Sequence, residues 1–179
     1  AGGCTERVAV RSSRYYEAAM TSPREVSFDT YLDTVFASPN WLDACVTMLS
    51  AFVEDIDACR DDPGRRLPDL APPIAAQVSA LNDRAQRLHQ QLRSSAEQRG
   101  PAFQTSELGA ILWWAGMAAH KATAAAGTAR DQIAENAWED AFFELHALMY
   151  ETMSALPLLS VAESMMQRME TEPGRSRPN

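Results

Sequence analysis

Apolar residues recur through most of this chain at alternating intervals of three and four, the spacing of a helix with one buried side. Two such seams are especially regular. The first consists of Leu42, Cys45, Leu49, Phe52, Ile56 and Cys59. The second consists of Ile74, Val78, Leu81, Ala85, Leu88 and Leu92. Each predicts a long helix, and the strict alternation of the second is the a/d pattern of a bundle or coiled coil.

Capping and breaking residues indicate where the first helices begin and end. Ser27 is expected to cap a short helix that runs through Ala37. A new helix is expected from residues 38–39, a Ser-Pro pair, because the first helical position needs no N–H group and suits proline. Proline and glycine crowd residues 61–73, which we expect to form the main loop, with Pro73 opening the next helix.

The stretch from Thr105 to Gly127 is apolar on most sides and rich in alanine and glycine. A helix without a polar face must be covered by its neighbours, so we expect this to be the buried central helix of the fold. Thr105 or Ser106 can serve as its N-cap, and Gly127 suits the left-handed position that follows a last helical turn.

Two further helices are expected after this central one. The Thr-Ala-Arg-Asp run at residues 128–131 resembles a capping box, which predicts that a helix begins there. It should end near Leu156, because Pro157 breaks or kinks a helix. A short last helix is expected from Leu158 to about Met169.

Together these elements predict an all-α fold, an antiparallel helical bundle of four long helices plus shorter terminal helices. Residues 1–26 show no consistent pattern and form an N-terminal extension, residues 27–170 form the bundle domain, and residues 171–179 are expected to be a disordered tail. Small residues on the central helix would let a neighbouring helix approach closely. They are Ala115, Ala119, Ala122 and Ala126.

Composition and charge narrow the range of functions. A chain of 179 residues that is 46% hydrophobic can bury one core without disulfides or metal. Its net charge is −8, and its basic residues are scattered rather than gathered in a stripe. We therefore expect neither a nucleic acid nor an anionic membrane as a partner, whereas a basic protein partner suits the acidic surface.

The cysteines indicate a compartment rather than a disulfide framework. Cys45 and Cys59 fall on one expected helix about 21 Å apart, too far for an intrachain bond. Two core thiols fit a reducing, cytoplasmic setting. Residues 1–4, AGGC, resemble the end of a bacterial lipoprotein cleavage site, so an alternative is an anchor through Cys4, and Met20 is an alternative start of the chain.

The three histidines lie on three different expected long helices, and Glu139 falls on the same flank of its helix as His146. Imidazoles and carboxylates on facing helices are how bundles build internal metal sites. The candidate ligands are His89, His120, Glu139 and His146. A small bundle with histidines on several helices resembles the DinB-type metal-dependent enzymes, which would imply a divalent transition metal as cofactor. Their paired His-x-x-x-His is absent, since Tyr150 stands four residues after His146.

Aromatic and methionine residues suggest two further kinds of site. An apolar pocket for a small ligand could be lined by Trp113, Met117, Trp138 and Phe142. Adjacent helical residues point about 100° apart, so one of the two neighbouring tryptophans is free to meet another molecule. Methionine-rich helix faces are adaptable binding surfaces. The candidate interface residues are Trp114, Met165, Met166 and Met169.

The leading interpretation is a non-enzymatic interaction or regulatory protein that associates with itself, such as an inhibitor, immunity protein or regulatory subunit. No nucleophile elbow or phosphate-binding glycine loop is present, so no catalytic residue or cofactor is assigned. The metal-dependent bundle enzyme and the small-ligand-binding bundle remain the alternatives.

Overall fold

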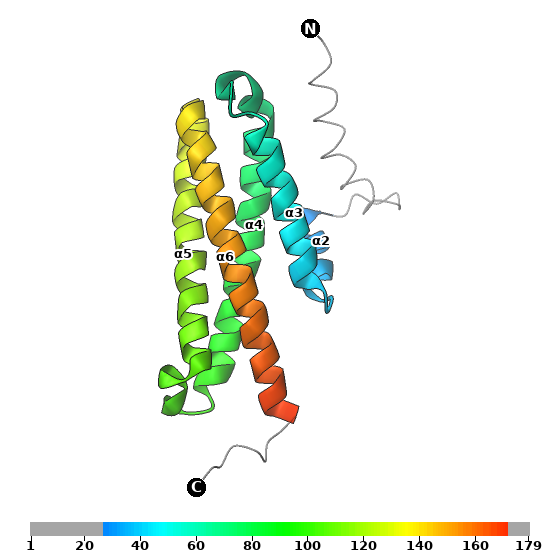
Figure 1. Cartoon of the computed structure of the whole chain (residues 1–179), viewed down its shortest axis with the longest axis vertical. Helices are drawn as coiled ribbons and strands as arrows, with labels where there is room; N and C mark the ends of the chain where they lie inside the picture. Colours follow the sequence, from blue (N-terminus) through cyan, green and yellow to red (C-terminus); the bar gives the residue numbers. More distant parts are fainter. Residues whose placement is uncertain (1–26, 172–179) are drawn as a thin grey trace.

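The structure, a computed structural model, describes residues 27–171, which form helices joined by short turns (Figure 1). The elements are α2 (Phe28–Phe36), α3 (Trp41–Asp57), α4 (Pro63–Glu97), the 3₁₀ helix η1 (Pro101–Thr105), α5 (Glu107–Ala134) and α6 (Trp138–Thr171). No strand occurs in this part of the chain, and the expected all-α class is confirmed. The expectations for residues 1–26, Cys4 and Met20 included, and for 172–179 lie outside the described residues.

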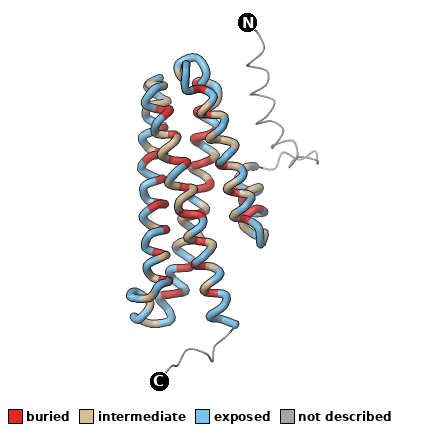
Figure 2. Tube along the Cα trace, in the orientation of Figure 1, coloured by how far each residue is buried: buried red, intermediate tan, exposed pale blue. Residues whose placement is uncertain are grey.

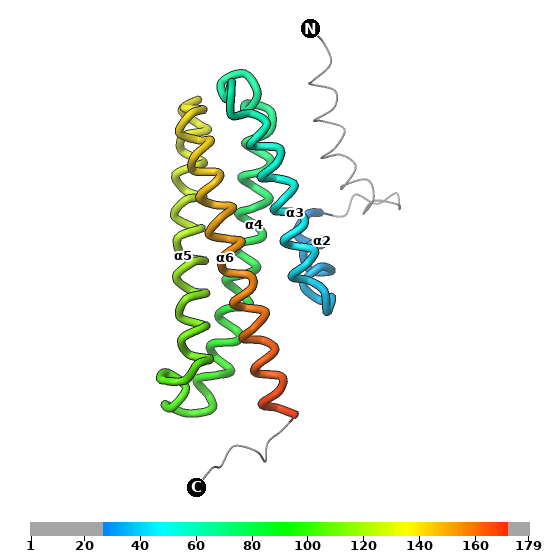
Figure 3. The backbone as a smooth tube through the Cα atoms, in the orientation of Figure 1, coloured from blue at the N-terminus to red at the C-terminus, as the bar shows by residue number. Residues whose placement is uncertain are grey.

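The long helices lie side by side, each antiparallel to the next in sequence (Figures 1 and 3). Helices α4, α5 and α6 pack against one another, and α3 packs against α4 and α6. Helices α3 and α5 do not touch, because they lie on opposite sides of the α4–α6 pair. Helix α5 is therefore covered on one side only.

Two polar contacts set the register of α3 against α6. At one end, Trp41 Nε1 donates a hydrogen bond to Glu163 Oε2 at 3.0 Å. At the other end, His146 Nε2 lies 3.1 Å from Asp57 Oδ1. The two helices are thus fixed side by side over the whole length of α3.

The core of α5 is made almost entirely of alanine. Beside two leucines, its buried residues are Ala115, Ala118, Ala119, Ala122, Ala125, Ala126 and Ala129. The separation of two packed helices depends on the side chains at the contact, so this strip lets α4 and α6 approach α5 closely. In Figure 2 the buried positions of the three helices face one another.

Helix α5 is not the enclosed central helix that the sequence predicted. Trp113 and Trp114 are 57% and 59% exposed on its outer side. The long helices that contact all the other long helices are α4 and α6. The physical reason is that a narrow strip of alanines suffices to dock α5, so its remaining apolar residues are left uncovered.

The start that the sequence predicts for α5 is right, and the predicted end is wrong. Ser106 is its N-cap, and the Ser106 hydroxyl accepts from the Gly109 N–H at 3.1 Å. The helix does not end at Gly127 but runs to Ala134, so the capping-box run 128–131 lies inside it. The chain reverses only at Asn136, which takes the left-handed conformation with φ 57°. Asparagine tolerates this conformation better than most residues.

The expected proline-rich loop is also wrong, because α4 begins at Pro63 and contains Pro68, Pro72 and Pro73. The apolar seam continues upstream through buried Leu67 and Ala71, and this burial offsets the local cost of proline in a helix. In the same way α6 runs through Pro157, which faces solvent, so the two expected last helices are one.

Candidate functional site

The structure places the four candidate metal ligands on separate surfaces. His120 is exposed on α5, and Glu139 is exposed in the first turn of α6. His89 and His146 each have hydrogen-bond partners of their own. Within residues 27–171, no group of three or more His, Cys, Asp or Glu side chains is placed to hold a metal ion.

His89 holds α4 against α5. Its Nε2 lies 2.9 Å from the Leu112 carbonyl oxygen and so carries the donated proton. Its ring lies over Gly116, where an added Cβ would be 2.9 Å from the imidazole. Burial lowers the pKa of His89, and the positive charge of Arg93 lowers it further. The hydrogen bond to Leu112 acts to raise the pKa but does not cancel this shift. This histidine therefore has a packing role between two helices.

His146 joins α6 to the end of α3. Its Nδ1 lies 2.8 Å from the Phe142 carbonyl oxygen, and its Nε2 contacts Asp57 Oδ1, which Arg60 Nη2 also approaches at 2.8 Å. Burial acts to raise the pKa of Asp57, but the hydrogen bonds from Arg60 and His146 outweigh it and lower the pKa below its ordinary value. The cluster is a polar tether in which the His146–Asp57 contact links the two helices and Arg60 forms an ion pair with the same carboxylate.

This tether makes a small part of the stability depend on pH. Because the pKa of Asp57 is lowered in the folded state, the stabilisation is present above the ordinary carboxyl pKa and lost as pH falls through the folded value. Asp57 is 41% exposed, so solvent screening limits the contribution to a few tenths of a kcal/mol.

We expect Asp57→Asn to lower the free energy of unfolding at pH 7 and to have no such effect near pH 2, as measured by urea denaturation at both pH values. The control is Asp83→Asn, which removes one exposed carboxylate from α4 and should change neither value. An equal loss of stability at both pH values would show that the charge of Asp57 does not contribute to the free energy of unfolding.

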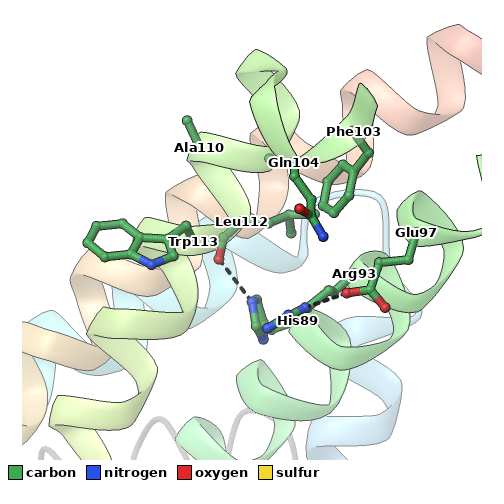
Figure 4. Close-up of a pocket in the computed structure, with 9 residues that line it drawn as sticks. His89, Arg93, Glu97, Phe103, Gln104, Ala110, Leu112 and Trp113 are labelled. Atoms are coloured by element: carbon green, nitrogen blue, oxygen red, sulfur yellow. Dashed lines mark hydrogen bonds and ion pairs between the residues drawn. The ribbon is translucent and has the colours of Figure 1, made fainter. Parts of the chain in front are cut away.

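A pocket of about 370 Å³ lies where η1 folds over the start of α5 (Figure 4). It is lined by His89, Arg93, Glu97, Phe103, Gln104, Gly109, Ala110, Leu112 and Trp113. The Arg93–Glu97 ion pair, at 2.8 Å, neutralises the two charged groups of the lining. Gly109 permits the close approach of η1, since a Cβ there would lie 2.3 Å from the Phe103 carbonyl oxygen.

The expected apolar pocket is not assembled as predicted. Trp113 does line a pocket, but Trp138 and Phe142 begin α6 at the opposite end of the molecule, about 30 Å away by helical rise. Met117 lies one turn beyond Trp113 on the outer side of α5. Periodicity could not reveal the other lining residues, because η1 brings them in by folding back on α5.

Exposed apolar residues form the most distinctive surface. Every large apolar side chain that is exposed among the described residues belongs to α5 or α6. They are Trp113, Trp114, Met117, Phe143, Tyr150, Val161 and Met169. The rings of the two tryptophans meet edge to face with centroids 4.6 Å apart. We call Trp113, Trp114, Met117, Phe143, Tyr150 and Val161 the α5/α6 face.

The predicted interface set is only partly on the surface. Trp114 and Met169 are exposed, whereas Met165 is half-buried and Met166 is buried in the core. The methionine stripe of the last helix therefore packs mainly against its own fold, because the uninterrupted α6 carries it alongside the other long helices.

Comparison with known proteins gives no relative from which to carry over a function. No protein-family model matches this chain, and no curated protein or solved structure is significantly similar to it. None of the helices within residues 27–171 combines the length and the apolar character needed to cross a membrane.

Proposed function

We propose that this chain is a non-enzymatic interaction protein that associates with itself through the α5/α6 face. The observation that carries the proposal is the confinement of the exposed large apolar side chains to these two helices. Exposed large apolar side chains that are gathered on one part of a protein are typical of a contact with another molecule. Phe143 and Tyr150, at 68% and 69% exposure, would be the side chains that gain most from being covered.

Trp114 of α5 lies on the side of its helix that faces α6. The Lys121–Glu151 ion pair, at 3.9 Å, sets these two residues side by side on antiparallel helices. Two turns further along each helix, Trp114 of α5 lies level with Leu158 of α6. Val161 lies one turn beyond Leu158 on α6. Trp114 therefore extends the apolar surface of α6 onto α5.

The excess of acidic residues supports a second form of this proposal, in which the protein regulates a basic protein partner. With a net charge of −8, the remaining surface would attract a basic protein partner and raise its local concentration. A metal-dependent enzyme is not proposed, because the candidate ligands lie apart in the described part of the chain.

Native mass spectrometry and sedimentation of the full chain test this proposal. We expect a dimer or higher oligomer that Tyr150→Glu weakens at least tenfold, because dimerisation would bury a carboxylate in place of an aromatic ring. Gln91→Glu is the matched control: it adds the same charge at an exposed position of α4 and should leave the oligomer unchanged. A chain that stays monomeric at every concentration measured would contradict the proposal.

The pocket beside η1 favours a second candidate, the binding of a small ligand with an aromatic body. Its volume of about 370 Å³ falls in the range of small-molecule sites, and Phe103 and Trp113 supply flat apolar walls. The same mass spectra would show such a ligand as an added mass, which Trp113→Ala should remove.

A further inference from the structure

The outer side of α6 carries a regular stripe without charged residues. Its positions alternate by four and three, the a/d spacing with which helices pair in coiled coils. They are Phe143, Ala147, Tyr150, Ser154, Pro157 and Val161, which we call the α6 stripe. Each is exposed or half-exposed, and the buried residues of α6 lie on its other side. The helix therefore has a second seam that its own fold leaves largely uncovered, although Ala147 partly packs against the core.

We propose that a second copy of this chain covers the α6 stripe, with the two α6 helices antiparallel and crossing at the level of Thr152, whose own side chain is buried on the opposite side. This inference rests on the proposed function and assigns the contact to the α6 part of the α5/α6 face. In an antiparallel pair each a position meets a d position of the partner, and the stripe is symmetric about Thr152. Phe143 then meets Val161, Ala147 meets Pro157, and Tyr150 meets Ser154.

These pairings are self-complementary in size. The two large rings of the stripe, Phe143 and Tyr150, each meet a smaller residue of the partner, so neither ring is forced against its own copy. Such a contact is isologous and closes as a two-fold dimer, the commonest form of oligomer. A parallel pair would instead stack Phe143 on the partner's Phe143 and Tyr150 on the partner's Tyr150.

Charges at the two ends of the stripe select the same direction. Glu139 lies in the first turn of α6 and Arg168 in the last, and both are exposed. Antiparallel pairing brings each Glu139 within about one helical turn of the partner's Arg168, a distance that the long arginine side chain spans. Parallel pairing would set Glu139 against the partner's Glu139, so like charges would meet at both ends.

The net charge of the chain does not oppose this contact. The stripe itself contains no charged side chain, and Glu151 on its flank is paired with Lys121 of α5. The acidic residues that produce the net charge of −8 therefore lie outside the apolar centre of the contact, where water and salt screen their repulsion.

A charge-swap series on the full chain tests this arrangement. Glu139→Arg and Arg168→Glu are each expected to weaken the dimer about three- to tenfold, because each replaces two rim ion pairs by two repulsions. The double swap Glu139→Arg/Arg168→Glu restores opposite charges and should return the dissociation constant to within about twofold of the original. Sedimentation velocity gives these constants, and thermal melting confirms that each variant is folded.

The results distinguish a failure of the antiparallel pairing from a failure of self-association itself. Weakening by the single swaps with recovery in the double swap supports the antiparallel pair. A dimer that is weakened by Tyr150→Glu but shows no recovery in the double swap would overturn this pairing and leave self-association standing. A chain that is monomeric throughout would overturn both.

Discussion

Replacing Ala122 with leucine is expected to lower the free energy of unfolding by about 3 kcal/mol, the upper range for forcing extra methylenes into a packed core. Ala122 is fully buried in the alanine strip of α5, at the contact with its neighbouring helices. A larger side chain there would need space that the close packing of α5 against its neighbours does not provide.

The matched control is Ala124→Leu on the same helix. Ala124 is exposed on the outer side of α5, so this change should stay within about 0.5 kcal/mol of the original stability. Urea denaturation at one fixed protein concentration measures both variants, since association also stabilises a fold. Similar losses for both variants, or none for Ala122→Leu, would show that α5 is not packed closely along its alanine strip.

Two glycines of α5 should respond in opposite directions to alanine. Gly109→Ala is expected to lower the free energy of unfolding by about 2 kcal/mol, because the new Cβ would lie 2.3 Å from the Phe103 carbonyl oxygen. That oxygen belongs to the backbone of η1, so relief requires η1 to move. Gly127→Ala meets no atom within 4 Å and should gain about 0.5–1 kcal/mol from the better helix propensity of alanine.

Urea denaturation compares the two glycine variants directly, and the tryptophan fluorescence of a protein in which the other three tryptophans are replaced by phenylalanine reports on the pocket through Trp113. We expect its emission to change in Gly109→Ala, because Trp113 shares that pocket with Phe103 of η1. A stabilised Gly109→Ala protein with unchanged emission would show that η1 does not rest on the start of α5.

The apolar seams could be predicted because each depends only on local spacing. Cys45, Leu49 and Ile56 on α3 are buried, and so are Val78 and Leu81 on α4. A helix fixes which residues share a side, and only apolar residues gain from being covered. The periodic pattern therefore reported both the helix and its buried side without knowledge of any neighbour.

The prolines and glycines that predicted helix ends gave wrong boundaries for a physical reason. Residues 61–73, Gly127 and Pro157 all carry local signals for a turn, yet all three lie wholly or largely inside helices. A glycine inside a helix costs about 1 kcal/mol and a proline about 3 kcal/mol, whereas each large apolar side chain that a continuous seam buries gains about 2 kcal/mol along the whole helix. Local propensity is a small term, and the packing that outweighs it depends on residues far away in the sequence.

The contacts of the candidate site residues also join positions that are far apart in the sequence. His146 and Asp57 are 89 positions apart, and no local pattern relates them. Trp113 was expected in a pocket, but its neighbours in that pocket are His89, Arg93 and Phe103 rather than the aromatic residues of α6. The α6 stripe has a regular period that can be read in the sequence, but the buried seam of the same helix masks it.

By itself, the sequence determined that this protein is helical, which residues of α3 and α4 face the core, and that the N-cap of α5 is Thr105 or Ser106, of which the structure shows Ser106. Only the tertiary structure decided which sides of α5 and α6 remain uncovered. A helix rich in alanine has apolar groups all round and only a weak preference for burying one side, so its orientation depends on its neighbours. The placement of α3 and α5 on opposite sides of α4 and α6 left the outer apolar residues of α5 and α6 on the surface.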